Sequence, residues 1–154
     1  MKIESPDFGY GEHIPFQFTK YGENQRPEVQ IKEVPAHARS LALIMDDPDA
    51  PKGTFTHWVA FNLPPATQQI EGNEVITEGL EGQNDWKETA YGGPRPPDGE
   101  HRYYFRLYAL DRVFELPEGI TRSTLEEAMR GHVLAKAEWM GRFATPVQAE
   151  RDAG

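Results

Sequence analysis

The sequence predicts a mainly β protein with short helices near its C-terminus, and three observations support this fold class. Thirteen prolines and fourteen glycines are spread along the chain, as is typical of many short elements joined by turns. Several short segments are rich in β-branched and aromatic residues, whereas only one region has a helical pattern. At 154 residues the chain is expected to form one domain, 1–154, and to bury a core without disulfides.

Four segments are predicted to be strands. In chain order they are Glu28–Val34, Ser40–Asp47, Phe55–Leu63 and His101–Leu110. The second has no clean alternation of apolar and polar residues, which is expected of a strand buried on both faces. In the fourth, alternation places Tyr103, Phe105 and Leu107 on one face and the intervening arginines and tyrosines on the other.

The helical region is predicted to begin at Ser123, because Ser123 and Glu126 have the spacing of a capping box. Large side chains then recur at helical spacing, at Leu125, Met129, His132, Trp139 and Phe143. Gly131 predicts a break, so we expect two short helices that pack on the sheet. Beyond Phe143 little can be buried, and the last residues are expected to be mobile.

Charge and composition exclude several classes of function. The net charge is −9, which disfavours broad binding to nucleic acid or to anionic membranes. The chain has no cysteine, so thiolate metal sites and cysteine nucleophiles are excluded. The start of the sequence has no secretory apolar run, and no segment is long and apolar enough to span a bilayer. We therefore expect a soluble cytoplasmic protein.

Titratable side chains gather at predicted strand ends. Asp47 and Asp49 follow one strand within Asp-Pro turns, and His57 lies at the start of the next. His101 opens the last strand, directly after the glycine- and proline-rich loop "YGGPRPPDGEH". The aspartates could simply build the turn. If the strand ends converge, however, the imidazoles, the Tyr103 hydroxyl and free backbone N–H groups of the loop would form a phosphate-sized anion pocket.

Other chemistries fit less well. No histidine and aspartate pair has short metal-motif spacing, so a metal site is not favoured and no cofactor is expected. The three serines, Ser5, Ser40 and Ser123, do not lie in a nucleophile elbow. A hydrolase or lyase could use a histidine as general base, oriented by an aspartate, but no clear nucleophile accompanies it. The exposed aromatic and proline-rich loop could instead dock a protein or a second copy of the chain.

Three motifs together resemble the phosphatidylethanolamine-binding proteins, also called Raf kinase inhibitor-like proteins, in their bacterial and archaeal branch. The motifs are "VPAHARSLALIM", "DDPDAPKGTFTHWVAFNLP" and "AYGGPRPPDGEHRYYFRLYALD", in this order, and they span residues 34–111. The resemblance implies a Greek-key β-sandwich of two antiparallel sheets with C-terminal helices. It also implies a small cavity that accepts phosphate, phosphorylethanolamine or similar anions.

The resemblance further implies which residues form that cavity. The ligand-binding positions are Asp47, Asp49, His57, Gly93, Pro94, His101 and Tyr103. Pro51 and Trp86 are expected to shape its walls. Many microbial relatives carry cysteine at the position of Arg95, so here the rim gains a cation that either strengthens anion capture or is solvated. Arg26-Pro27 replaces the serine-proline that usually precedes the second strand.

The function implied by the resemblance is that of a non-enzymatic binding protein. It would take a phosphate-bearing small molecule and modulate a kinase or protease partner, as relatives do. Relatives occur as monomers and as dimers, so a homodimer is compatible with the sequence. In animal members a C-terminal helix adds an aromatic side chain to the pocket edge, and no counterpart is found after Phe143.

Overall fold

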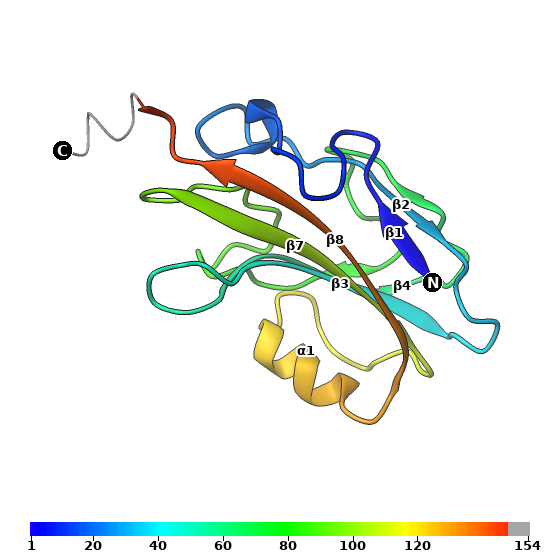
Figure 1. Cartoon of the computed structure of the whole chain (residues 1–154). Helices are drawn as coiled ribbons and strands as arrows, with labels where there is room; N and C mark the ends of the chain where they lie inside the picture. The colour runs from blue at the N-terminus through cyan, green and yellow to red at the C-terminus, as the bar shows by residue number, and fades with distance from the viewer. Residues whose placement is uncertain (148–154) are drawn as a thin grey trace.

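The computed structural model describes residues 1–147, and the expectation about the last residues of the chain lies outside this range (Figure 1). The elements are β1 (Lys2–Glu4), η1 (Phe16–Phe18), β2 (Val29–Lys32), β3 (Ser40–Asp47), β4 (Phe55–Leu63), β5 (Gln69–Ile70), β6 (Leu80–Glu81), β7 (Glu100–Leu110), α1 (Arg122–Met129) and β8 (Val133–Ala144). A three-stranded sheet has the order β1-β2-β5 and a five-stranded sheet the order β6-β4-β3-β7-β8, both antiparallel. The predicted fold class, mainly β with two antiparallel sheets, is confirmed.

The central strand of the larger sheet, β3, separates two hydrophobic cores. Its side chains Leu43 and Met45 pack toward the smaller sheet and share a core with Ile31 of β2. On the opposite face Ile44 packs against Leu125 of α1. Figure 1 shows this layering, with β1 and β2 on one side of the larger sheet and α1 on the other. Burial on both faces explains the absence of alternation along this strand.

The strand predictions succeed where the burial pattern is strong. Ser40–Asp47 and Phe55–Leu63 match β3 and β4 at both ends, and β7 begins one residue earlier than predicted. In β7 the predicted alternation is confirmed, because Tyr103, Phe105 and Leu107 are buried. The first predicted strand is shorter, and β1, β5 and β6 have only two or three residues each and were not predicted.

The prediction of two C-terminal helices is wrong, because the second predicted helix is the strand β8. The spacing between Trp139 and Phe143 fits one turn of a helix, but it also fits two repeats of a strand. Pairing decides between the two structures. β8 lies along the whole of β7, from Glu100 opposite Ala144 to Leu110 opposite Val133. The long ladder satisfies backbone hydrogen bonds and places alternate side chains against the core.

The helix α1 is short, and its first turn differs from the prediction. Thr121, not Ser123, is the N-cap, since its side chain accepts a hydrogen bond from the Thr124 N–H at 3.2 Å. The predicted break is correct, because α1 ends at Met129 and Gly131 adopts a left-handed φ of 81° in the turn into β8. Within residues 1–147, no helix is long and apolar enough to cross a membrane.

Candidate functional site

The candidate site lies at one end of the larger sheet. β3 ends at Asp47, and its two antiparallel neighbours, β4 and β7, both begin near that point. His57 near the start of β4, and His101 and Tyr103 near the start of β7, are therefore brought together. The ring centroids of His57 and His101 lie 5.3 Å and 6.5 Å from that of Tyr103.

Asp47 and His101 form a buried pair. Nδ1 of His101 lies 2.6 Å from Oδ2 of Asp47, and the two residues are only 5% and 3% exposed. A carboxylate can only accept, so His101 donates from Nδ1 and its ring orientation is fixed. The other Asp47 oxygen accepts the Asp49 N–H at 2.8 Å. This last bond is the turn-building role considered from the sequence, so Asp47 both builds the turn and orients an imidazole.

His57 is held by the glycine-rich loop. Its Nδ1 donates to the Gly92 carbonyl at 2.7 Å, and its ring packs edge-on against Trp86 with centroids 5.0 Å apart. Burial lowers the pKa of His57 to about 4, although the bond to Gly92 and the Asp47 charge act in the opposite direction. The ring is therefore neutral near physiological pH. With Nδ1 carrying the proton, Nε2 is left as a hydrogen-bond acceptor.

Tyr103 supplies an unused donor. The residue is completely buried, and among the described residues its hydroxyl has no hydrogen-bond partner. Burial raises the pKa of Tyr103, and the neighbouring Asp47 carboxylate raises it further through its charge and through a contact with the hydroxyl that falls outside hydrogen-bond geometry, so the hydroxyl keeps its proton. A buried hydroxyl without a partner costs free energy unless a ligand or water satisfies it. The site therefore contains a donor that makes no hydrogen bond of good geometry within residues 1–147.

The glycine-rich loop is positioned by its own backbone. Gly93 donates its N–H to Oδ1 of Asn24 at 2.7 Å, and Gly92 donates to the His57 carbonyl at 2.9 Å. A Cβ at Gly93 would collide with the Phe18 carbonyl, so only glycine allows this approach. The Pro94 carbonyl accepts the backbone N–H of Lys20. The N–H groups of these two glycines are therefore already used within the protein.

Three predicted residues turn away from this centre or lie on its outside. The Asp49 carboxylate is bound by the Arg102 side chain at 2.8 Å and 2.9 Å and by the Arg102 N–H. These bonds lower the pKa of Asp49 to about 2. Pro51 and Arg95 are both exposed, and within residues 1–147 neither is joined to the histidines by a hydrogen bond or an ion pair.

Two residues that border the site were missed by sequence reasoning. The Lys20 ammonium lies 3.5 Å from the centroid of the Trp86 ring and 3.8 Å from Glu88. Its charge also contributes to lowering the pKa of His57. Tyr21 donates its hydroxyl to the Pro96 carbonyl at 2.7 Å. Nothing in the local sequence indicates these contacts, because they join the loop after η1 to residues about seventy positions away.

The site does not have the geometry of a metal centre. In the part of the chain that the structure describes, no three histidine, aspartate or glutamate side chains are grouped closely enough to hold a metal ion. Both Nδ1 atoms already donate hydrogen bonds, and the Asp47 carboxylate is occupied on both oxygens. The arrangement is better suited to hydrogen bonding with a small polar ligand.

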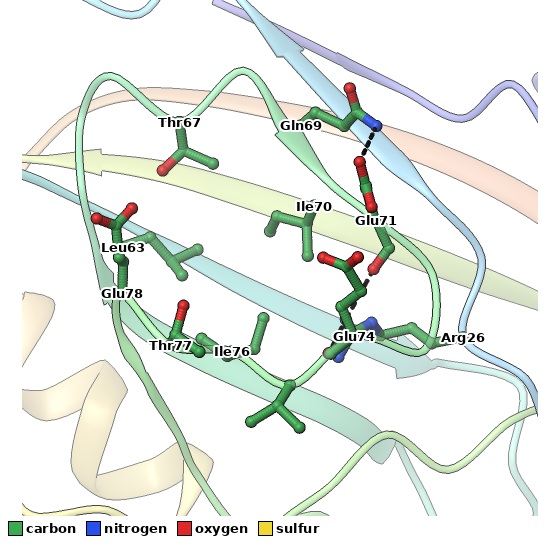
Figure 2. A pocket seen from close by; sticks show the side chains of 11 residues that line it. Arg26, Leu63, Thr67, Gln69, Ile70, Glu71, Glu74, Ile76, Thr77 and Glu78 are labelled. Carbon is green, nitrogen blue, oxygen red and sulfur yellow. Dashed lines mark hydrogen bonds between the residues drawn. The ribbon is translucent and has the colours of Figure 1, made fainter.

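A separate hollow of about 300 Å³ is lined by Arg26 and by residues between Leu63 and Glu78, none of which belongs to this centre (Figure 2). Arg26 is buried and donates from Nη2 to the carbonyls of Glu71 and Glu74 at 2.9 Å and 2.6 Å. Its guanidinium also lies over the Trp58 ring. The Arg26 substitution noted in the sequence thus fastens the neighbouring loop and has a structural role.

Comparisons with known proteins agree with the fold. A family model described as phosphatidylethanolamine-binding protein matches residues 4–144. A UPF0098 protein from Methanothermobacter thermautotrophicus is 43% identical over 148 residues, covering 93% of this chain and 98% of the relative. A structure described as a phosphatidylethanolamine-binding protein homologue from Chlamydia trachomatis has a TM-score of 0.90 at 39% identity, covering 94% and 97% of the two chains. The Escherichia coli YBCL structure, at 22% identity and a TM-score of 0.87 over 94% of this chain and 98% of YBCL, shares the fold. The chain therefore belongs to the phosphatidylethanolamine-binding protein family.

Proposed function

We propose that this protein is a non-enzymatic binding protein whose pocket takes phosphate, phosphorylethanolamine or a similar small anion. One observation carries the proposal: the Tyr103 hydroxyl is buried beside the rings of His57 and His101 and has no hydrogen-bond partner within residues 1–147. An anionic oxygen placed there would accept from Tyr103 and from a protonated Nε2 of His101. The name of the matching family points to a ligand that contains a phosphate group.

The absence of enzymatic activity is part of the proposal and is supported by the state of His57. A general base works best when its pKa lies near the operating pH, whereas burial lowers the pKa of His57 to about 4. Its Nδ1 is committed to the Gly92 carbonyl. Among the described residues, no serine side chain forms a hydrogen bond with His57 or His101.

Ligand titration followed by NMR tests the pocket. Inorganic phosphate or phosphorylethanolamine should shift the imidazole signals of both His57 and His101, and His101→Ala should abolish the shifts at His57 without unfolding the domain. His132→Ala is the matched control, because His132 pairs with exposed Asp111 and does not belong to the site. Signals that stay unmoved at millimolar ligand, the upper range of useful affinity for a small anion, would contradict the proposal.

A hydrolase or lyase is the second candidate, and the Asp47–His101 pair is the observation that favours it. A carboxylate 2.6 Å from an imidazole resembles the orienting pair of a general base. Turnover of generic phosphoesters or esters that disappears in His101→Ala, and separately in His57→Ala, would replace the binding proposal with this one. Absence of turnover in the native protein under conditions where phosphate binds would remove the enzyme.

Modulation of a kinase or protease in the cytoplasm is the partner-level part of the proposal. The exposed rim residues Pro51 and Arg95 leave the loops around the pocket open to a protein surface. Inhibition assays with kinases and proteases of the same cell, with and without phosphate, measure this effect. Light scattering over a range of concentrations tests the homodimer, and a strictly monomeric result would remove it.

A further inference from the structure

The hydrogen-bonding pattern inside the pocket bears on which anions it accepts, and the inference drawn from it rests on the proposed function. One of the groups that meet there is an acceptor with an unused lone pair, and a second carries a negative charge. Nε2 of His57 has no partner among residues 1–147, and the Asp47 carboxylate is buried beside Tyr103. A fully deprotonated oxyanion also offers only acceptors. Next to these groups, the oxygen lone pairs of such an anion would repel the Nε2 lone pair and the carboxylate, with no hydrogen between them to form a bond.

The state of His57 follows from geometry. The Gly92 carbonyl lies 2.7 Å from Nδ1 and can only accept, so the ring proton sits on Nδ1 and the Nε2 lone pair is free. The charged groups that act on this ring are Asp47, which favours protonation, and Lys20, which opposes it. Burial outweighs Asp47, and the pKa of His57 falls to about 4. The lone pair therefore persists throughout the neutral range.

The remaining groups at the centre can donate. Tyr103 carries an unpartnered buried hydroxyl, and burial together with the Asp47 charge raises its pKa, which keeps the proton in place. His101 uses Nδ1 to bind Asp47 and offers Nε2–H when it is protonated. The ligand that matches these groups is thus an oxyanion that accepts two hydrogen bonds, from Tyr103 and His101, and donates one to His57.

We propose that the pocket selects phosphorus oxyanions that keep one P–OH hydrogen, namely inorganic phosphate and the monoprotonated form of phosphate monoesters, and rejects sulfate and phosphodiesters. The P–OH donates to Nε2 of His57, while the anionic oxygens accept from Tyr103 and His101. Sulfate has the same shape and charge as hydrogen phosphate but no hydrogen to donate. Sites built around a ligand hydroxyl reject analogues that lack it by large factors, and at least about tenfold is expected here.

Four small anions test the proposal on the native protein by NMR titration at equal ionic strength. At about pH 5, below the second ionisation of a phosphate monoester at about pH 6, inorganic phosphate and methyl phosphate should bind, whereas sulfate and dimethyl phosphate should bind at least about tenfold more weakly. Dimethyl phosphate stands for the diester of a lipid headgroup and methyl phosphate for a free monoester. Equal binding of phosphate and sulfate would overturn this inference and leave the proposed function standing. Binding of neither would overturn both.

A pH series gives a second readout, the ratio of the affinities for two anions. Any titration of the protein affects both affinities alike and cancels in this ratio. The second ionisation of a phosphate monoester has a pKa of about 6, so methyl phosphate loses its last hydrogen as the pH rises, whereas inorganic phosphate keeps one. The ratio of the methyl phosphate and phosphate affinities should fall by about tenfold between about pH 7 and about pH 8. Because both anions meet the same site groups, a ratio that does not change with pH would contradict the proposal.

His57→Gln provides the matching variant, because a glutamine amide can donate where the imidazole nitrogen accepts. It should bring the phosphate-to-sulfate ratio close to one, mainly by strengthening sulfate binding. His132→Gln, on the far turn beside Asp111, is the control and should leave the ratio at its native value. If His57→Gln binds phosphate and still rejects sulfate to the native extent, the assignment of the acceptor to His57 is wrong. The native comparison of anions decides the proposal if this variant does not fold.

Discussion

Asp46 and Asp47 are consecutive residues of β3, equally buried, and their carboxylates serve opposite faces of the sheet. On one face Asp46 is bound by Arg106 and by Arg122, each at 2.8 Å. On the other face Asp47 is bound by the imidazole of His101, beside the unpartnered hydroxyl of Tyr103. A buried carboxylate alone therefore does not mark a functional site.

The partners make the difference. Guanidinium groups keep their charge at every accessible pH. Their N–H groups satisfy the oxygens of the Asp46 carboxylate, so this face of the sheet needs no ligand to complete its hydrogen bonds. The ion pair between Asp46 and Arg122 also attaches α1 to the sheet, because Arg122 is the first residue of the helix. The Asp47 face uses imidazole and phenol groups, and within the described residues it leaves the Tyr103 hydroxyl and the His57 Nε2 without hydrogen bonds. Incomplete hydrogen bonding distinguishes the candidate site from the structural network.

The largest expected effect comes from Asp46→Ala, which breaks the structural network. Arg106 and Arg122 are only 28% and 20% exposed, so the variant leaves two partly buried cations without their carboxylate. The free energy of unfolding, measured with urea, should fall by about 3 kcal/mol. Phosphate affinity of the folded fraction should change little. A loss of less than about 1 kcal/mol, the range of surface ion pairs, would show that the two faces do not differ in this way.

Acid should destabilise the protein at the candidate site, through His57. An unfolded histidine takes up a proton near pH 6.5, whereas folded His57 does so near pH 4, so the folded state binds fewer protons between these values. The stability contribution is therefore fully present above pH 6.5 and is lost as the pH falls toward 4, by about 3 kcal/mol in total. Urea unfolding at several pH values measures this slope.

His57→Phe supplies the comparison for that measurement. The free energy of unfolding of this variant should change less with pH than that of the native protein over the same window, because phenylalanine takes up no proton at this position. The arginines of the Asp46 network do not titrate there and cannot produce the slope. An unchanged slope in His57→Phe would contradict the assignment to His57.

Tyr103→Phe should separate stability from binding. The lost hydroxyl has no hydrogen-bond partner within residues 1–147, so the free energy of unfolding should stay the same or rise by up to about 1 kcal/mol. Phosphate affinity should fall by about tenfold, because a hydrogen bond to an anion is removed. Urea unfolding and NMR titration measure the two quantities on one sample. A variant that is less stable and binds phosphate as before would reverse the expected pattern.

The smallest effect is expected from Lys20→Met. The Lys20 ammonium lies over Trp86 at the edge of the site, so its removal should weaken phosphate binding about threefold at low salt and less at high salt. The pKa of His57 should rise, because Lys20 contributes to lowering it. Lys136→Met on β8 is the control for the same loss of charge. Equal effects of the two variants would show that Lys20 acts only through net charge.

Part of the fold and site could be read from the sequence because the signals are local. β3, β4 and β7 were predicted because their burial imposes long, consistent patterns. β8 was not, since spacing of four residues suits a helix and a strand alike. The family resemblance named the residues of the histidine cluster, but it could not show that Asp49 turns to Arg102.

By itself, the sequence determined the central strands, the family and the titratable groups that could meet at the candidate site. Those properties follow from residue type and order, which fix side-chain alternation and available chemistry. Only the tertiary structure decided that Asp46 is neutralised by two arginines while Asp47 orients His101, and that Lys20 lies on Trp86. The physical reason is that these partners are brought together by strand pairing and loop packing, and burial then sets which of them hold a proton.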